Sequence, residues 1–201
     1  GSWRLNYRYT LEDGEISIYF QNLFENTSGL ELNNFPDGVW GVFWRLPENN
    51  PVRGILYEYS QTTWLSQSGE GSGENHFNNG TYRSGWAYFN RIIGTPYIKF
   101  DPTRPAAINN RFVAHHLGIR STFSNLDLKL MGSYVSYIGS INGTFDTPEN
   151  IILTQLQMEY TLWEKIKVGL QLGADLSDLN GENLGAGLSF RYSLSESYRM
   201  Y

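Results

Sequence analysis

The chain has 201 residues, a formal net charge of −5 and no cysteine. The negative balance argues against a nucleic-acid-binding protein, and the lack of cysteine excludes a disulfide framework, a thiolate metal site and a cysteine nucleophile. Aromatic residues make up 15% of the chain and charged residues only 17%, with 21 glycines, a composition typical of all-β or membrane-interfacial proteins.

Alternation of apolar and polar side chains recurs along the chain and predicts β-strands. In the first segment, Leu5 and Tyr7 fall on one face while Asn6 and Arg8 fall on the other. Most of the predicted segments are about 10 residues long, the length of a tilted transmembrane strand, whereas typical soluble strands have about 5 to 6 residues. The expected strands cover residues 3–11, 15–23, 38–46, 54–64, 111–123, 126–139, 151–162, 166–176 and 183–194.

Short and long connections alternate between these strands. The short ones are Glu12–Gly14, Pro47–Arg53, Ser124–Asn125 and Trp163–Lys165; the longer ones are residues 24–37, 65–110, 140–150 and 177–182. Outer-membrane barrels combine tight periplasmic turns with long external loops, whereas a soluble up-and-down barrel has no reason to sort its loops in this way. The pattern therefore favours an all-β, antiparallel transmembrane β-barrel in the cell outer membrane of a Gram-negative bacterium.

The number of strands bears on how much of a barrel the chain supplies. Single-chain bacterial barrels have an even number of strands, and nine are predicted here. We therefore expect residues 1–201 to be the C-terminal part of a single larger barrel, whose other strands come from a missing N-terminal part or from other chains. The alternative is a tenth strand hidden around Gly85–Ile93 in the long loop 65–110.

Aromatic residues cluster toward the ends of the predicted strands. Such rings suit the headgroup level of a membrane, and the alternative is that they form cross-strand pairs in a soluble sheet. The pairs are Tyr7 and Tyr9, Trp40 and Trp44, Tyr57 and Tyr59, and Tyr160 and Trp163.

Residues 36–96 contain the least generic part of the sequence. Pro36–Val42 reads as one strand, and Gly54–Thr62 is a strand with the core Tyr57-Glu58-Tyr59. The following loop, Asn75–Pro96, contains an Asn/His stretch, a Gly-aromatic step and an Arg-x-Ile-Gly motif. This succession resembles the capsule assembly Wzi family of outer-membrane barrels, whose members are considerably longer than this chain.

The resemblance implies attachment of capsular or related exopolysaccharide to the cell surface, without turnover of the polymer. It places Glu58 on a barrel strand and a set of candidate ligands in the adjoining loop. Their rings can stack on pyranoses, their amides offer donors and acceptors, and their guanidinium groups can bind carboxylates or phosphates. The alternative for this loop is an ordered plug that fills the lumen. The expected polysaccharide-binding residues are His76, Asn78, Asn79, Tyr82, Arg83, Trp86, Tyr88 and Arg91.

Charged residues also lie on the polar faces of the strands. The predicted lumen residues are Glu58, Arg120, Lys129, Glu159 and Arg191, accompanied by Arg8, Lys167 and Asp175. Salt-bridged packing of the lumen wall is the expected role, and a glycosidase pair of carboxylates is the alternative. The runner-up function is a porin or channel in which these charges set selectivity and loop 65–110 constricts the pore.

A weaker similarity concerns catalysis. His76–Gly80 looks superficially like the His-x-Ser-Asn-Gly stretch of outer-membrane phospholipase A, but Asn78 stands where the nucleophilic serine would be. A lipid hydrolase is therefore the least favoured function, and no catalytic residue is predicted.

Two further patterns bear on metal binding. His115 and His116 are adjacent on a strand and point to opposite faces, so they do not form a metal pair. The acidic stretch around Asn180–Gly181 predicts a hairpin turn rather than a calcium loop, because Leu176 occupies the position of the first ligand. We expect no metal and no cofactor. The expected partners are surface polysaccharide, outer-membrane lipid and the other chains or missing N-terminal strands that complete the barrel, and no nucleic acid is expected.

Overall fold

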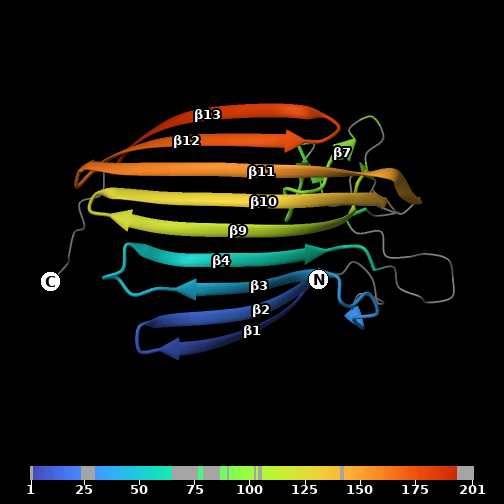
Figure 1. Ribbon diagram of the computed structural model, residues 1–201, viewed down its shortest axis with the longest axis horizontal. Coiled ribbons are helices and arrows are strands. Elements are labelled where there is room, and N and C mark those ends of the chain that lie inside the picture. Colours follow the sequence, from blue (N-terminus) through green and yellow to red (C-terminus); the bar gives the residue numbers. More distant parts are fainter. Residues whose placement is uncertain are drawn as a thin grey trace.

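The protein is described by a computed structural model that covers residues 2–23, 30–64, 77–78, 87–89, 91–101, 103, 106–140 and 143–193. Nine long strands form one antiparallel sheet in the order β1-β2-β3-β4-β9-β10-β11-β12-β13 (Figure 1). Their bounds are β1 Ser2–Leu11, β2 Gly14–Leu23, β3 Gly38–Arg45, β4 Val52–Gln61, β9 Arg111–Phe123, β10 Leu126–Ser140, β11 Gly143–Trp163, β12 Ile166–Ser177 and β13 Gly181–Tyr192.

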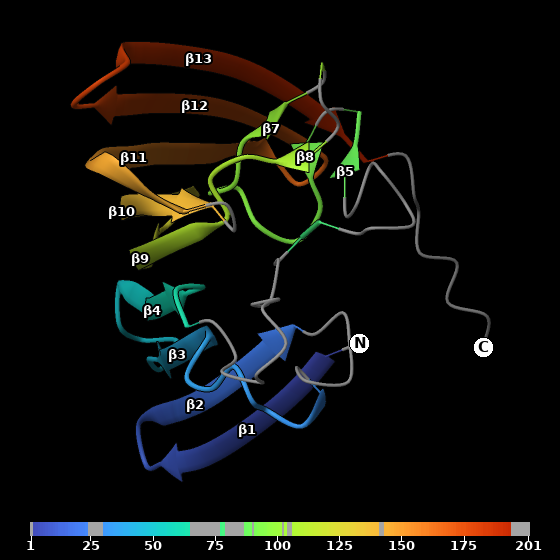
Figure 2. The same cartoon turned by 90° about the vertical axis from the view of Figure 1, so that its right-hand side faces the viewer.

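Four two-residue strands lie between β4 and β9. β5 (Ala87–Tyr88) pairs with β6 (Arg91–Ile92), and β7 (Phe100–Asp101) pairs with β8 (Ala106–Ala107). Seen from the side, the long strands follow one another along an arc, and β5, β7 and β8 lie on its hollow side (Figure 2). The loop between β4 and β9 therefore turns back toward the concave face of the sheet.

The nine predicted strands are confirmed, with two corrections. The expected loop 140–150 is wrong, because β11 begins at Gly143 and its first residues pair with the end of β10 across a bulge. The tenth strand around Gly85–Ile93 is also wrong in the described part of that segment, since Ala87–Tyr88 pairs locally with Arg91–Ile92 and does not join the large sheet. The predicted turn at Asn180–Gly181 is confirmed, and Gly181 adopts a φ of 81° there.

Successive connections alternate between the two ends of the sheet, but they are sorted by length only in part, because the connections of residues 141–142 and 178–180 are short and lie at the same end as the long loop. The two-residue turns after β1, β9 and β11 and the connection between β3 and β4 lie at one end (left in Figure 1). The long loop before β9 lies at the other end. Within the described ranges, no helix is both long and apolar enough to cross a membrane.

The two faces of the sheet differ in polarity, because strand side chains alternate and the register aligns like with like. One row across all nine strands of the convex face contains Tyr9, Ile16, Trp44, Ile55, Ile119, Leu130, Leu156, Leu172 and Ala186. The neighbouring row on the concave face contains Thr10, Glu15, Arg45, Gly54, Arg120, Lys129, Gln157, Gln171 and Gly187. The sheet is therefore apolar on its convex face and largely polar on its concave face.

The sheet is open. β1 and β13 are its two edges, and each pairs on one side only within the described residues. Because neighbouring strands alternate in direction, the first and ninth strands run parallel to each other and cannot pair in an antiparallel way. The structure thus shows an all-β fold with a large antiparallel sheet that does not close.

Gly41 gives the concave face a site where a side chain would not fit. A Cβ at this position would lie 2.0 Å from the Tyr19 ring on the adjacent strand, whereas a Cβ at Gly132 on the convex face would meet nothing within 4 Å. Overpacking of this kind costs about 1–3 kcal/mol. We therefore expect Gly41→Ala to lower the free energy of unfolding in denaturant titrations while Gly132→Ala leaves it close to wild type. Equal effects of the two changes would show that the Tyr19 ring moves aside freely.

Candidate functional site

The loop between β4 and β9 is held to the concave face by a hydrophobic cluster. From the loop come Phe77, Ile92, Tyr97, Ile98 and Ala107, and from β9, β10 and β11 come Phe112, Ala114, Val135, Tyr137 and Ile151. All of these residues are buried, and Val135 is fully inaccessible to solvent. In its described part, the loop is thus packed against the concave face of the sheet.

Polar contacts at the same place fasten the loop further. The Tyr137 hydroxyl donates to the Tyr97 carbonyl, and the Tyr97 hydroxyl lies 3.3 Å from the Ser133 hydroxyl. Burial raises the pKa of the Tyr97 hydroxyl. Lys99 of the loop forms an ion pair with Glu149 of β11, at 3.0 and 3.1 Å to its two carboxylate oxygens.

A cavity of about 340 Å³ lies between the loop and the wall, and we call it the loop cavity. It combines aromatic rings with polar groups, a mixture that suits small polar ligands such as sugars. Glu58 is one of its residues, and its carboxylate accepts a hydrogen bond from the Tyr19 hydroxyl. The lining is Gln21, Asn22, Gly38, Val39, Glu58, Ser60, Gln61, Thr62, Phe77, Gly94, Thr95, Pro96, Tyr97, Phe112 and His116.

The two histidines lie on opposite faces, as predicted. His115 is on the convex face, where its Nδ1 lies 2.8 Å from the Tyr57 hydroxyl. His116 lines the loop cavity, with its Nδ1 2.8 Å from the Ser133 hydroxyl. Glu58 is the cross-strand neighbour of His116, but its carboxylate accepts its hydrogen bond from Tyr19 and not from His116. Ser133, His116 and Glu58 therefore do not form a hydrogen-bonded triad, and the contact between Ser133 and His116 is part of the polar packing under the loop.

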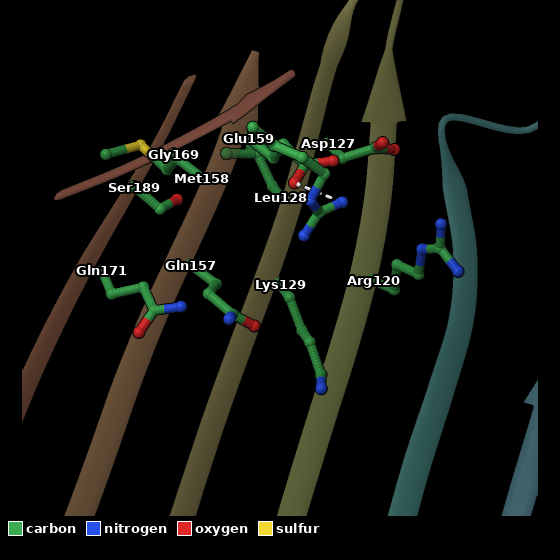
Figure 3. Close-up of a pocket in the computed structure, with 11 residues that line it drawn as sticks. Arg120, Asp127, Leu128, Lys129, Gln157, Met158, Glu159, Gly169, Gln171 and Ser189 are labelled. Carbon is green, nitrogen blue, oxygen red and sulfur yellow. Dashed lines mark ion pairs between the residues drawn. The ribbon is translucent and has the colours of Figure 1, made fainter. Parts of the chain in front are cut away.

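A second concavity, the wall pocket, lies on the concave face over β9 to β13 and has a volume of about 210 Å³ (Figure 3). Glu159 forms ion pairs there with Lys167 at 2.8 Å and with Arg191 at 3.3 Å. Arg120 and Lys129 are directly opposed on β9 and β10. The lining is Arg120, Asp127, Leu128, Lys129, Gln157, Met158, Glu159, Gly169, Gln171, Ser189 and Arg191.

Four of the five predicted lumen residues meet in the wall pocket, namely Arg120, Lys129, Glu159 and Arg191. The fifth, Glu58, lies in the loop cavity instead. The sequence could place all five on polar strand faces. It could not divide them between two sites, because that division depends on the register of six strands.

The predicted polysaccharide-binding residues differ in where the structure places them. His76, Asn79, Tyr82, Arg83 and Trp86 lie outside the described residues. Asn78 has a structural contact, because its amide donates to the Ala107 carbonyl at 3.0 Å and accepts from the Ala107 N–H at 2.7 Å. Tyr88 and Arg91 are exposed on the small β5–β6 hairpin.

Some polar residues that anchor the loop were not among the sequence candidates. The backbone N–H groups of Thr63 and Trp64 each donate a hydrogen bond of 3.0 Å to the buried Asp37 carboxylate. Turn chemistry at Pro36-Asp37-Gly38 could have indicated such a side-chain-to-backbone contact. The ion pair between Lys99 and Glu149 joins residues 50 positions apart, so no local sequence pattern could have predicted it.

Comparison with known proteins gives no family for this chain. No family model matches it, and neither a curated protein nor a solved structure matches it. The resemblance to the capsule assembly Wzi family therefore stays a prediction.

Proposed function

We propose that this chain forms part of the wall of an outer-membrane β-barrel that binds or anchors surface polysaccharide without chemical turnover. The observation that carries the proposal is the convex face, where large apolar side chains are exposed on strands from one edge of the sheet to the other. Examples are Leu5 at 68%, Leu130 at 52% and Leu188 at 84% exposed. Water is a poor solvent for a continuous apolar face of this size, whereas the hydrocarbon core of a membrane covers it.

Aromatic side chains on the same face fit this placement. Tyr9, Trp44, Tyr160 and Tyr192 are exposed near the short-turn end of their strands, and Trp3 and Trp40 are exposed near the other end. Rings at both borders of an apolar band match the two interfaces of a bilayer. Nine strands would then need an odd number of further strands to close the wall with antiparallel pairing throughout.

The polysaccharide role is supported by the chemistry of the concave face. The wall pocket offers amide groups from Gln157 and Gln171 together with charged groups, and the loop cavity offers aromatic rings beside Glu58 and Gln61. Such groups bind sugars through hydrogen bonds to hydroxyls and through ring stacking. In the described part of the chain there is no cluster of three or more metal-ligating side chains.

The test compares cell-bound and released polysaccharide in the source bacterium with and without the gene. We expect deletion to shift polymer into the medium without lowering the total, and the wild-type gene to reverse the shift. Trp86→Ala and Arg83→Ala are expected to restore the barrel, seen as normal outer-membrane levels of the protein, but not the retention of polymer. An unchanged ratio on deletion would remove the anchoring role.

A channel is the second candidate, and the packing of the loop on the concave wall favours it. A loop that fills the lumen limits the conductance of a barrel, so its removal should widen the pore. In planar bilayers, deletion of residues 65–110 is expected to raise conductance severalfold if the function is transport. Conductance that is negligible with and without the loop would leave anchoring as the better explanation.

A further inference from the structure

We propose that the wall pocket binds the carboxylate group of an acidic sugar unit, with Arg120 and Lys129 as the anion-binding pair. This inference rests on the proposed polysaccharide binding and names the chemical class of the ligand. It concerns the strand wall rather than the loop residues that the sequence suggested.

The starting point is an unfavourable arrangement within the sheet. Arg120 on β9 and Lys129 on β10 are direct cross-strand partners on the same face. Like charges in this position repel each other and destabilise a sheet. Within the described part of the chain, neither side chain has an ion pair or a hydrogen bond that would offset this repulsion. An anion placed between the two cations would offset it.

The neighbouring carboxylates are already engaged. Glu159 is paired with both Lys167 and Arg191, and Asp127 accepts a hydrogen bond of 2.7 Å from the Thr122 hydroxyl. The lining as a whole contains three cations, Arg120, Lys129 and Arg191, against these two carboxylates, which leaves one positive charge. With Lys167, which pairs with Glu159, the count is four cations against two carboxylates, so the site is positive and attracts an anion such as the carboxylate of an acidic sugar.

Uncharged groups beside the cations suit the rest of a sugar ring. Lys129, Gln157 and Gln171 follow Arg120 in one row across β9 to β12 (Figure 3). Glutamine amides both donate and accept, as sugar hydroxyls require. Gly187, opposite Gln171 on β13, carries no side chain, and a Cβ there would come no closer than 3.9 Å to its neighbours, which leaves room for a ring beside Gln171. The pocket thus places an anion-binding end next to an amide-lined end.

The test uses the purified full chain in detergent and two probes, an oligogalacturonate and the same oligomer with its carboxyl groups reduced to alcohols. Calorimetric titration is expected to show that the acidic probe binds about tenfold more tightly, the contribution of a charge-assisted hydrogen bond. Arg120→Gln combined with Lys129→Gln should abolish this preference. Arg8→Gln removes a cation from the same face on β1, far along the sheet, and should preserve it.

A second measurement does not depend on the ligand. Because the repulsion disappears, Arg120→Gln is expected to raise the unfolding temperature of the ligand-free protein, whereas Arg8→Gln should not. Equal binding of the two probes by the wild type, or an acidic preference that survives in the double variant, would overturn the anion pair and leave polysaccharide binding in place. Binding of neither probe would overturn both.

Discussion

Replacement of Leu130 by arginine is expected to cost about 2–4 kcal/mol of stability in a bilayer, the cost of a cation on the lipid-facing side near the midplane of a barrel. Leu130 lies within the apolar row of the convex face, opposite Ile119 and Leu156, and is 52% exposed. In lipid this side chain contacts acyl chains, and an arginine there loses its hydration. Denaturant unfolding of the protein in vesicles measures the difference.

The control for this prediction is Gln155→Arg. Gln155 is on β11 and faces the concave side opposite Met131, so the same new charge enters the polar wall instead of the lipid. Gln155 is half-buried on this polar face, and we expect the variant to unfold within about 0.5 kcal/mol of the wild type, as most substitutions away from a packed core do. If both arginines were equally tolerated, the convex face would not contact hydrocarbon, and the membrane proposal would fall with it.

Strand positions were predictable because the alternation of side chains is nearly unbroken in them. In β9, the predicted bounds 111–123 coincide with the structure, because residues 116–120 alternate and the Ser124–Asn125 turn ends the strand, although Phe112–Ala114 is a run of three apolar residues. The start of β11 was not predictable, because residues 143–150 are rich in turn-forming types such as Asn, Gly and Pro. Gly143, Thr144, Glu149 and Asn150 pair with β10 on either side of a register shift, a tertiary effect that overrides local preference.

For the candidate site, the sequence predicted only which face of the sheet each side chain lies on. Alternation alone places Arg120, Lys129 and Glu159 on polar faces, but their meeting in one pocket needs the register between strands. The role of Asn78 could not be derived either. As a loop asparagine it suited a sugar, whereas the structure pairs its amide with the backbone of Ala107, 29 residues away.

Truncation of Phe112 should release the loop from the wall. This ring is 2% exposed and packs edge-on against Tyr97 of the loop and Tyr137 of β10, at centroid distances of 5.6 and 6.5 Å. Loss of a buried phenylalanine side chain costs about 3–5 kcal/mol. Some of this cost weakens the contact between the loop and the sheet and so raises the population of the detached loop. If most of the ~3–5 kcal/mol weakens that contact, the population rises by more than about a hundredfold. Faster cleavage by protease between β4 and β9, together with larger conductance in planar bilayers, would report the release.

Phe123→Ala is the matched control, because Phe123 is the last residue of the same strand and is 49% exposed. It should leave protease cleavage and conductance at wild-type values. Phe112→Ala could also loosen the sheet, and thermal unfolding separates the two effects, since release of the loop alone leaves the main transition in place. Cleavage as slow as in the wild type would mean that the polar contacts, above all the ion pair between Lys99 and Glu149, hold the loop without the aromatic cluster. Conductance that rises together with cleavage, while the main thermal transition stays in place, would show that the packed loop obstructs the path along the polar face, because the sheet is then unchanged and the loop contact is lost.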